Sequence, residues 1–202
     1  MGCVWAKQKT TRIFEDPSLL SSQTRFTVTE IKSLNELFRK LGSTLVDDGF
    51  LNREEFKLGL FGDSKKQSLF GDRMFDLFDS KRDGVLDFGE FVRSLNVFHP
   101  DTPRDEKAIF AFKLYDLWQT GYIEKEEVKV MVKEFLNESS LILSDDIIQA
   151  MVDKTFEEAD TEKDGKIDME EWKEFASLKP SLLRNMTIPY LRDIPTTFSS
   201  LG

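Results

Sequence analysis

Oxygen-bearing side chains recur at a fixed spacing between Asp160 and Glu171, a stretch that reads D-T-E-K-D-G-K-I-D-M-E-E. Carboxylates stand at positions 1, 3, 5, 9 and 12, Gly165 stands at position 6 where the chain must turn sharply, and position 7 needs to lend only its backbone carbonyl. Ca²⁺ is a hard cation that takes about six to eight oxygen ligands, and this spacing wraps one short loop around it. The expected ligands are Asp160, Glu162, Asp164, Lys166, Asp168 and Glu171.

Three further stretches repeat this spacing in weaker form, and we number the four loops along the chain. Loop 1 offers Asp48, Phe50, Asn52 and Glu55, with Thr44 in place of the first aspartate. Loop 2 offers Asp79, Asp83, Val85, Asp87 and Glu90. Loop 3 offers Asp116, Thr120, Tyr122 and Glu127. Repetition of one unit is stronger support than any single motif, and it predicts four helix–loop–helix units.

The four loops are not expected to bind Ca²⁺ equally. Loop 4 has the most side-chain ligands and is predicted to be the best site. In loop 2, Lys81 occupies position 3, where it supplies no oxygen and adds a like charge near the ion. In loop 3 the same position holds Trp118, so we expect weak or absent binding there. Loop 3 is then kept as the structural mate of loop 4.

The segments between the loops repeat apolar residues every three or four positions, which is typical of amphipathic helices rather than strands. Position 8 of each loop is apolar and can pair two loops through a short β-bridge; these residues are Leu51, Leu86, Ile123 and Ile167. The predicted fold is therefore all-α, with two lobes of paired EF-hands and short β-bridges between loops.

Composition excludes several classes of protein. A net charge of −9 over 202 residues disfavours nucleic acid as a partner, because phosphates require a basic face. The single cysteine, Cys3, rules out an intramolecular disulfide framework. No apolar run is long enough to span a bilayer. His99, the one histidine, lies between the two halves and is predicted to be a surface or lobe-interface residue, so no enzyme activity is expected.

With the loops placed, the whole chain resembles the plant calcineurin B-like calcium sensors. The segments that carry the resemblance are F-D-L-F-D-S-K-R-D-G-V-L-D-F-G-E-F-V-R-S-L-N-V-F-H-P (75–100), T-F-E-E-A-D (155–160), P-Y-L-R-D-I (189–194) and the initial M-G-C. The resemblance implies that loop 1 has two extra residues and runs from Gly42 to Glu55, with backbone carbonyls replacing the missing first carboxylate.

The resemblance also implies a function. Members of that family bind Ca²⁺ and dock on a dedicated family of Ser/Thr protein kinases through a short segment rich in Asn, Ala and Phe. An amphipathic helix in an apolar groove is the expected mode of docking. The residues after Pro180, notably Met186, Ile188, Tyr190, Leu191 and Ile194, are either a lid over that groove or a packed terminal helix. Alternatives are a regulatory B subunit of a calcineurin-type phosphatase and a calcium buffer; a homodimer is a further partner expectation.

Both ends of the chain carry modification signals that the resemblance implies. Gly2 is a candidate for myristate and Cys3 for palmitate, although Ala6 replaces the usual Ser or Thr. Two acyl chains predict attachment to the cytoplasmic face of the plasma or vacuolar membrane; an unmodified tail would leave the protein cytosolic. Ser200 matches a serine that the partner kinase phosphorylates, with changed flanking residues.

We divide the chain accordingly into four parts. Residues 1–25 form the acylation tail and lead-in, 26–98 the first EF-hand pair, 99–178 the second pair, and 179–202 a C-terminal helix and regulatory tail.

Overall fold

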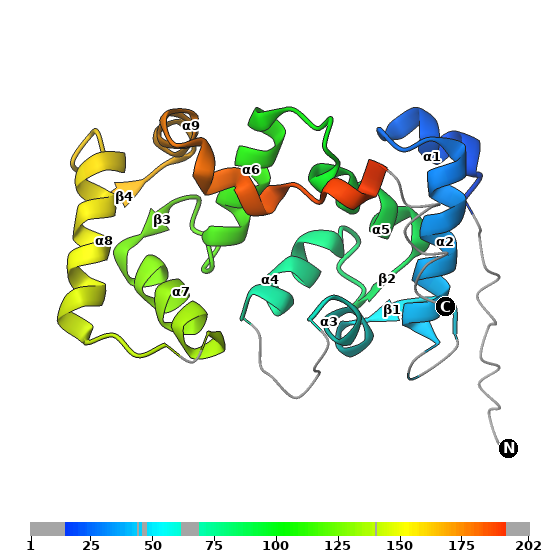
Figure 1. Ribbon diagram of the computed structural model, residues 1–202, viewed down its shortest axis with the longest axis horizontal. Helices are drawn as coiled ribbons and strands as arrows, with labels where there is room; N and C mark the ends of the chain where they lie inside the picture. The colour runs from blue at the N-terminus through cyan, green and yellow to red at the C-terminus, as the bar shows by residue number, and fades with distance from the viewer. Residues whose placement is uncertain (1–14, 44, 46–47, 62–68, 140, 193–202) are drawn as a thin grey trace, which may run out of the picture.

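The computed structural model describes residues 15–43, 45, 48–61, 69–139 and 141–192, and it consists of two helical lobes side by side (Figure 1). The first lobe contains α1 (Pro17–Gln23), α2 (Val28–Gly42), β1 (Leu51–Asn52), α3 (Arg53–Phe61), α4 (Leu69–Phe78), β2 (Val85–Leu86) and α5 (Phe88–Leu95). The second contains α6 (Arg104–Tyr115), β3 (Ile123–Glu124), α7 (Lys125–Glu138), α8 (Asp145–Ala159), β4 (Lys166–Ile167) and α9 (Met169–Leu178). The 3₁₀ turn η1 (Asn96–Phe98) lies between the two lobes in sequence.

The same residues that the loops offer as ligands also begin the helices that leave them. Asp87 caps α5 by accepting a hydrogen bond from the backbone N–H of Glu90, and the Glu90 side chain accepts one from the N–H of Asp87 in return. Asp168 and Glu171 form the same reciprocal capping box at the start of α9. Such boxes satisfy two N–H groups that a helix start leaves unpaired. Positions 9 and 12 therefore fix where each exiting helix begins.

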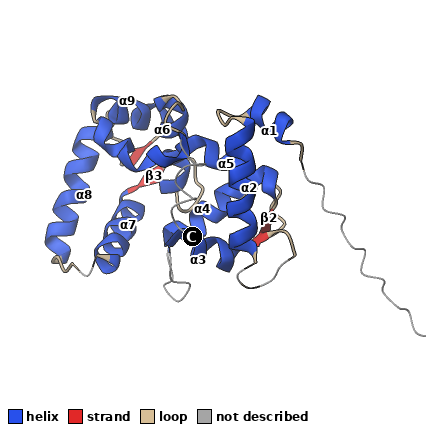
Figure 2. Cartoon of the chain, turned by 45° about the vertical axis from the view of Figure 1, so that its right-hand side comes forward, coloured by secondary structure: helices blue, strands red, loops and turns tan. Residues whose placement is uncertain are grey.

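The loops pair within each lobe through the predicted β-bridges, which are the short strands in Figure 2. β1 and β2 are antiparallel with Leu51 opposite Leu86, and β3 and β4 are antiparallel with Ile123 opposite Ile167. All four position-8 side chains are at most 2% exposed. The prediction of an all-α fold with paired EF-hands and short β-bridges is confirmed.

Aromatic side chains join the two lobes into one hydrophobic core. Phe78 of α4, Phe98 of η1 and Phe110 of α6 contact one another, with ring centroids 5.5 to 6.5 Å apart. His99 follows η1, is buried and meets the ring of Phe26 edge-on at 5.2 Å. The surface alternative for His99 was therefore wrong, because packing against the first lobe removes the imidazole from solvent; the lobe-interface alternative describes it.

After α9 the chain runs back toward the first lobe as two 3₁₀ segments, η2 (Pro180–Met186) and η3 (Pro189–Arg192), rather than as one helix (Figure 1). Met186 and Leu191 are buried, and Tyr190 is exposed. The N–H of Ile188 donates to the carbonyl of Phe98 at 2.9 Å. Residues 180–192 thus pack on the core, while Ile194 lies outside the described residues.

Candidate calcium-binding loops

Loop 4 is held in shape by its first carboxylate. The two oxygens of Asp160 accept hydrogen bonds from the backbone N–H groups of Asp164, at 3.1 Å, and Gly165, at 2.9 Å. Gly165 has a φ of +86°, which a residue with a Cβ rarely adopts. The position-1 aspartate and the position-6 glycine therefore close the tight turn that the spacing predicted.

Glu171 at position 12 is turned back into the same loop. One carboxylate oxygen accepts from the N–H of Glu162 at 3.0 Å and from the hydroxyl of Thr161 at 3.1 Å, and the other accepts from the N–H of Asp168 at 3.0 Å. Burial alone would raise the pKa of Glu171, but these hydrogen bonds outweigh it and lower the pKa below its usual value. These hydrogen bonds therefore favour the ionised form of the Glu171 carboxylate.

An open cavity of about 840 Å³ adjoins loop 4. Its carboxylates are Asp105, Glu162, Asp168, Glu170, Glu171 and Glu174. Lys173 is the only lysine or arginine among the described residues that line it. Carboxylates of one sign concentrated in a concave site raise the local concentration of cations. The donor set and the electrostatics of loop 4 therefore fit Ca²⁺.

Loop 3 has the same backbone arrangement but a less favourable carboxylate. Asp116 accepts from the N–H groups of Thr120, at 2.8 Å, and Gly121, at 2.9 Å, as Asp160 does in loop 4. Glu127 has no exposed surface, and burial raises its pKa despite hydrogen bonds from the N–H groups of Glu124 and Trp118. Ionising Glu127 is therefore harder than ionising Glu171, while the order in which the two loops bind Ca²⁺ stays a prediction.

Loop 2 keeps this arrangement too, because Asp79 accepts from the N–H groups of Asp83, at 3.1 Å, and Gly84, at 2.9 Å. Lys81 at position 3 points into the loop and contacts its carboxylates. The ammonium of Lys81 forms an ion pair with Asp87 and lies 3.8 Å from a carboxylate oxygen of Glu90. The hydrogen bond to Asp87 raises the pKa of Lys81 against the effect of burial.

Loop 1 is described in part, and its longer form stays a prediction from the family resemblance. Gly42 ends α2, and a Cβ there would lie 2.7 Å from the carbonyl oxygen of Phe50. Asp48 accepts from the N–H of Phe50 at 3.0 Å, and Glu55 accepts from the N–H of Asn52 at 3.0 Å. Glu55 is buried like the other position-12 glutamates. Thr44 lies outside the described residues.

Position 2 of the loops is a feature that the ligand pattern missed. The hydroxyl of Thr161 in loop 4 and that of Ser80 in loop 2 each donate to the position-12 glutamate, whereas position 2 of loop 3 is Leu117. The signal was visible in sequence as a hydroxyl residue after the first aspartate. It provides a physical reason why Glu127 is a poorer anion than Glu171.

Within the described residues, no group of three Asp, Glu, His or Cys side chains lies ready-made for a metal ion. The carboxylates of positions 1 and 12 are instead engaged with loop N–H groups, as above. The residue-by-residue ligand assignments therefore stay predictions from the spacing. Gly2, Cys3 and Ser200, the predicted modification sites, lie outside the described residues.

Comparison with known proteins gives the family. Residues 105–177 match the model of the EF-hand domain pair, and residues 70–95 match an EF hand. Calcineurin B-like protein 5 of Arabidopsis thaliana is 54% identical over 98% of this chain and 98% of its own length. The chain belongs to the calcineurin B-like family of EF-hand proteins. The calcineurin B subunit of Schizosaccharomyces pombe is 35% identical over 84% of this calcineurin B-like chain and 91% of its own length. A recoverin family protein of Dictyostelium discoideum is 32% identical over 89% of the chain and 88% of its own length.

Family membership confirms the resemblance seen in the sequence and the expectation of a non-catalytic calcium sensor or regulator. The family-model matches cover loops 2, 3 and 4, while loop 1 lies before both of them. None of the helices that the structure describes is both long enough and apolar enough to cross a bilayer.

Proposed function

We propose that this calcineurin B-like chain binds Ca²⁺ through its EF-hand loops and then docks on and activates a CBL-interacting Ser/Thr protein kinase. The observation that carries the proposal is an apolar surface on the second lobe. Its exposed members are Val130 and Phe135 on α7, Leu141, Ile142 and Leu143 between the helices, and Ile147 and Met151 on α8. We call this set the α7–α8 patch.

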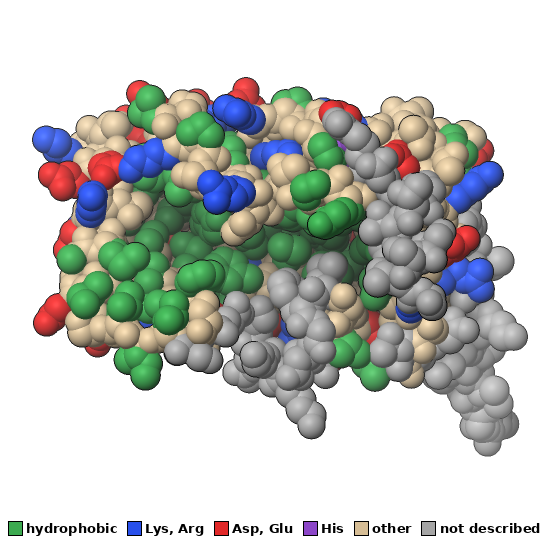
Figure 3. Space-filling view, viewed as in Figure 1, with side chains coloured by type: hydrophobic (Ala, Val, Ile, Leu, Met, Phe, Trp, Pro, Cys, Tyr) green, Lys and Arg blue, Asp and Glu red, His purple; other side chains and the backbone are tan. Residues whose placement is uncertain are grey.

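Figure 3 shows hydrophobic side chains gathering over α7 and α8 and continuing into a hollow toward the middle of the molecule. Contiguous apolar surface is uncommon on a soluble monomer and marks an interaction site. An amphipathic helix buries its apolar stripe on such a surface, and a kinase segment rich in Asn, Ala and Phe suits this mode. Ca²⁺ binding rearranges paired EF-hand helices, so it controls how much of the apolar surface is presented.

The test is calorimetric titration of Ca²⁺ into the full chain, with and without a peptide of the kinase docking segment. A sensor requires that Ca²⁺ strengthens peptide binding and that the peptide strengthens Ca²⁺ binding by the same factor. Tight Ca²⁺ binding with no response to the peptide would favour a buffer. Binding of a phosphatase B-binding helix in place of the kinase peptide would favour a phosphatase regulator, an alternative that the 35% identity to the calcineurin B subunit supports.

Matched variants locate the docking surface. Ile147→Ser places a hydroxyl in the α7–α8 patch and is expected to weaken peptide binding by about tenfold, the value of one buried apolar side chain. Leu178→Ser makes a comparable change at the end of α9, where the leucine is also exposed, and is expected to leave the peptide affinity unchanged. Equal losses in the two variants would place docking elsewhere.

We also propose that the N-terminus brings the complex to a membrane. The proposal is supported by Gly2, the residue type that accepts myristate after methionine removal, and by Cys3 beside it. One acyl chain anchors marginally and two anchor stably. Mass spectrometry of protein expressed in plant cells reads out the modifications directly. Membrane fractionation is then expected to show stable attachment of the wild type, weakened attachment of Cys3→Ser and no attachment of Gly2→Ala. The same fractionation distinguishes the plasma membrane from the vacuolar membrane.

Phosphorylation of Ser200 by the bound kinase is a further proposal, since phosphate would add about −1.5 to −2 charge for a basic patch on the kinase to pair with. It is tested by incubating the complex with ATP and comparing the wild type with Ser200→Ala. A homodimer, the remaining partner expectation, is checked by sedimentation of the same sample with and without Ca²⁺.

A further inference from the structure

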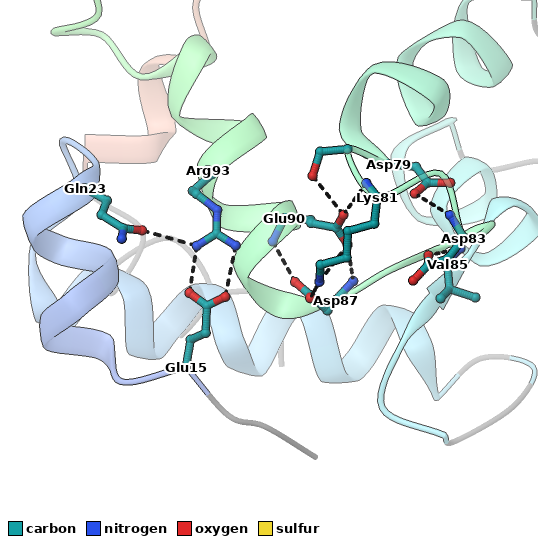
Figure 4. Close-up of polar contacts among 10 residues, drawn as sticks. Glu15, Gln23, Asp79, Lys81, Asp83, Val85, Asp87, Glu90 and Arg93 are labelled. Carbon is teal, nitrogen blue, oxygen red and sulfur yellow. Dashed lines mark hydrogen bonds and ion pairs between the residues drawn. The ribbon is translucent and has the colours of Figure 1, made fainter. Parts of the chain in front are cut away.

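Lys81 places a positive charge among the ligands of loop 2 (Figure 4). It stands at position 3, yet its side chain reaches across the loop to Asp87 at position 9 and toward Glu90 at position 12. The Glu90 side chain is only 1% exposed, and one of its oxygens also accepts from the backbone N–H of Lys81 at 3.0 Å. The residue that lacks a ligand oxygen thus contacts the carboxylates that a bound ion would need.

Arg93, a second cation near loop 2, is paired with a carboxylate outside the loop. Arg93 on α5 holds Glu15 through two hydrogen bonds, at 2.7 and 2.9 Å, and also donates to Gln23 (Figure 4). Its charge is therefore tied to the lead-in before α1. Lys81, by contrast, is half exposed and sits on a flexible four-carbon stem, so its ammonium can leave the loop.

The other complete loops differ at this point. Position 3 is Trp118 in loop 3 and Glu162 in loop 4. The ion pairs formed among the described residues include Glu90 but neither Glu127 nor Glu171. Loop 2 therefore has a counter-charge beside its position-12 glutamate where the described parts of loops 3 and 4 have none.

We propose that Lys81 is a tethered cation that occupies the anionic side of loop 2 until Ca²⁺ displaces it. This inference rests on the proposed calcium function and deepens it. A divalent ion at about 2.3–2.6 Å from several oxygens outcompetes a single, partly solvated ammonium, so loop 2 can fill. It fills only at a higher Ca²⁺ concentration than its own carboxylates would set, which places the filling of loop 2 after that of loop 4.

The matched pair of variants is Lys81→Gln and Arg82→Gln. Both remove one positive charge from the same loop, but Arg82 is exposed at position 4 and forms no ion pair with another described residue. Its φ is +56°, the value that Gln119 adopts at the equivalent position of loop 3, so glutamine is tolerated there. Arg82→Gln therefore controls for net charge alone.

The readout is the backbone amide of the position-6 glycine of each loop in ¹⁵N-glycine-labelled full-length protein during Ca²⁺ titration. The N–H of Gly84 donates to Asp79 at 2.9 Å, so its resonance reports loop 2, while that of Gly165 reports loop 4. Lys81→Gln is expected to lower the half-saturating Ca²⁺ concentration at Gly84 by roughly threefold to tenfold, the range for one partly exposed charge. Arg82→Gln is expected to lower it by less than about twofold.

A second readout is the Tm of the two variants, compared without Ca²⁺ and at saturating Ca²⁺. Without Ca²⁺, Lys81→Gln removes the ammonium that pairs with Asp87 and Glu90, so its Tm is expected to fall below that of Arg82→Gln. At saturating Ca²⁺ the order is expected to reverse. The reversal distinguishes displacement from a merely structural ion pair, which would lower the Tm in both conditions.

Three results would overturn the inference: equal shifts at Gly84 in the two variants, no shift in Lys81→Gln, or a Gly84 amide that never responds to Ca²⁺. In each of these cases a normal response at Gly165 would leave the proposed calcium function intact. Loss of the response at every position-6 glycine would remove that function instead, and the inference with it.

Discussion

Every loop has a glutamate at position 12, but in loops 3 and 4 the groups around that glutamate differ and shift its pKa in different directions. Glu171 receives hydrogen bonds from one hydroxyl and two N–H groups and has a lowered pKa, whereas Glu127 is fully buried, receives only N–H groups and has a raised pKa. A metal ligand must be deprotonated, so a carboxylate with a lowered pKa meets less competition from protons for the cation. The two glutamates therefore differ in how easily they ionise, although the loop spacing treats them alike.

This difference predicts the outcome of two matched substitutions. Glu171→Gln is expected to weaken the tightest Ca²⁺ site on the order of a hundredfold, because a charge lost at contact distance is worth several kcal/mol even at an effective dielectric constant of about 20. Glu127→Gln is expected to change the total bound Ca²⁺ little. Calorimetry on the two variants measures both effects, and equal losses would show that the order of loops 3 and 4 is wrong.

Some contacts of single residues follow from local sequence patterns and others do not. The ligand spacing, the position-6 glycines and the position-8 apolar residues are local patterns, so they predicted the loops and the β-bridges directly. The direction of the Lys81 side chain is not local in this sense, since four rotatable bonds let it point to solvent or across the loop. The burial of His99 depends on Phe26, far away in sequence, which no local spacing reveals.

At the scale of elements, the strand pair β3–β4 joins a weak loop to a strong one. Ile123 and Ile167 face each other across it and are each 2% exposed. A helix–loop–helix unit cannot bury its apolar face alone, so loop 4 relies on loop 3 for its shape whether or not loop 3 binds an ion. Loop 3 therefore has a structural role in supporting loop 4, which its ligand residues alone do not indicate.

Ile123→Ala is accordingly expected to weaken Ca²⁺ binding in loop 4, although the substitution is in loop 3. The cavity costs about 2–5 kcal/mol of folding free energy, and part of that loss falls on the paired loop. The control is Leu86→Ala, an equally buried position-8 residue in the other lobe, which is expected to leave loop 4 unchanged. Titration followed at the Gly165 amide separates the two, and an identical response in both variants would contradict local pairing.

The element boundaries were predicted less completely than the loops. Amphipathic spacing indicated the helices that flank loops 2, 3 and 4, because their apolar faces repeat every three or four residues. It did not indicate α1, a short helix whose one buried residue is Leu20. The expected C-terminal helix is instead η2 and η3, since Pro180 and Pro189 start new segments and cannot donate helical hydrogen bonds.

At the scale of the whole molecule, the C-terminal segment runs from α9 toward the first lobe and packs on α6 and on the turn η1 between the two lobes. The N–H of Ile188 donates to the carbonyl of Phe98, and the buried ammonium of Lys107 donates to the hydroxyl of Thr187 at 2.6 Å. Burial lowers the pKa of Lys107, and the repulsion of Arg25 lowers it further. The position of Lys107 is therefore fixed by its burial and by the hydrogen bond to Thr187.

This arrangement fits both alternatives for residues 180–192, a packed terminal segment and a lid that covers the groove while it is empty. Met186 is 3% exposed, so Met186→Ala is expected to cost about 2–5 kcal/mol and to lower the Tm by roughly 5–15 °C in a chain of this size. Tyr190→Ala, at a residue that is 68% exposed, is expected to change the stability by no more than about 0.5 kcal/mol. Thermal unfolding followed by circular dichroism measures both. Peptide affinity separates the two alternatives: a lid competes with the kinase peptide, so Met186→Ala would strengthen peptide binding, whereas in a packed terminal segment the same substitution would leave peptide binding unchanged.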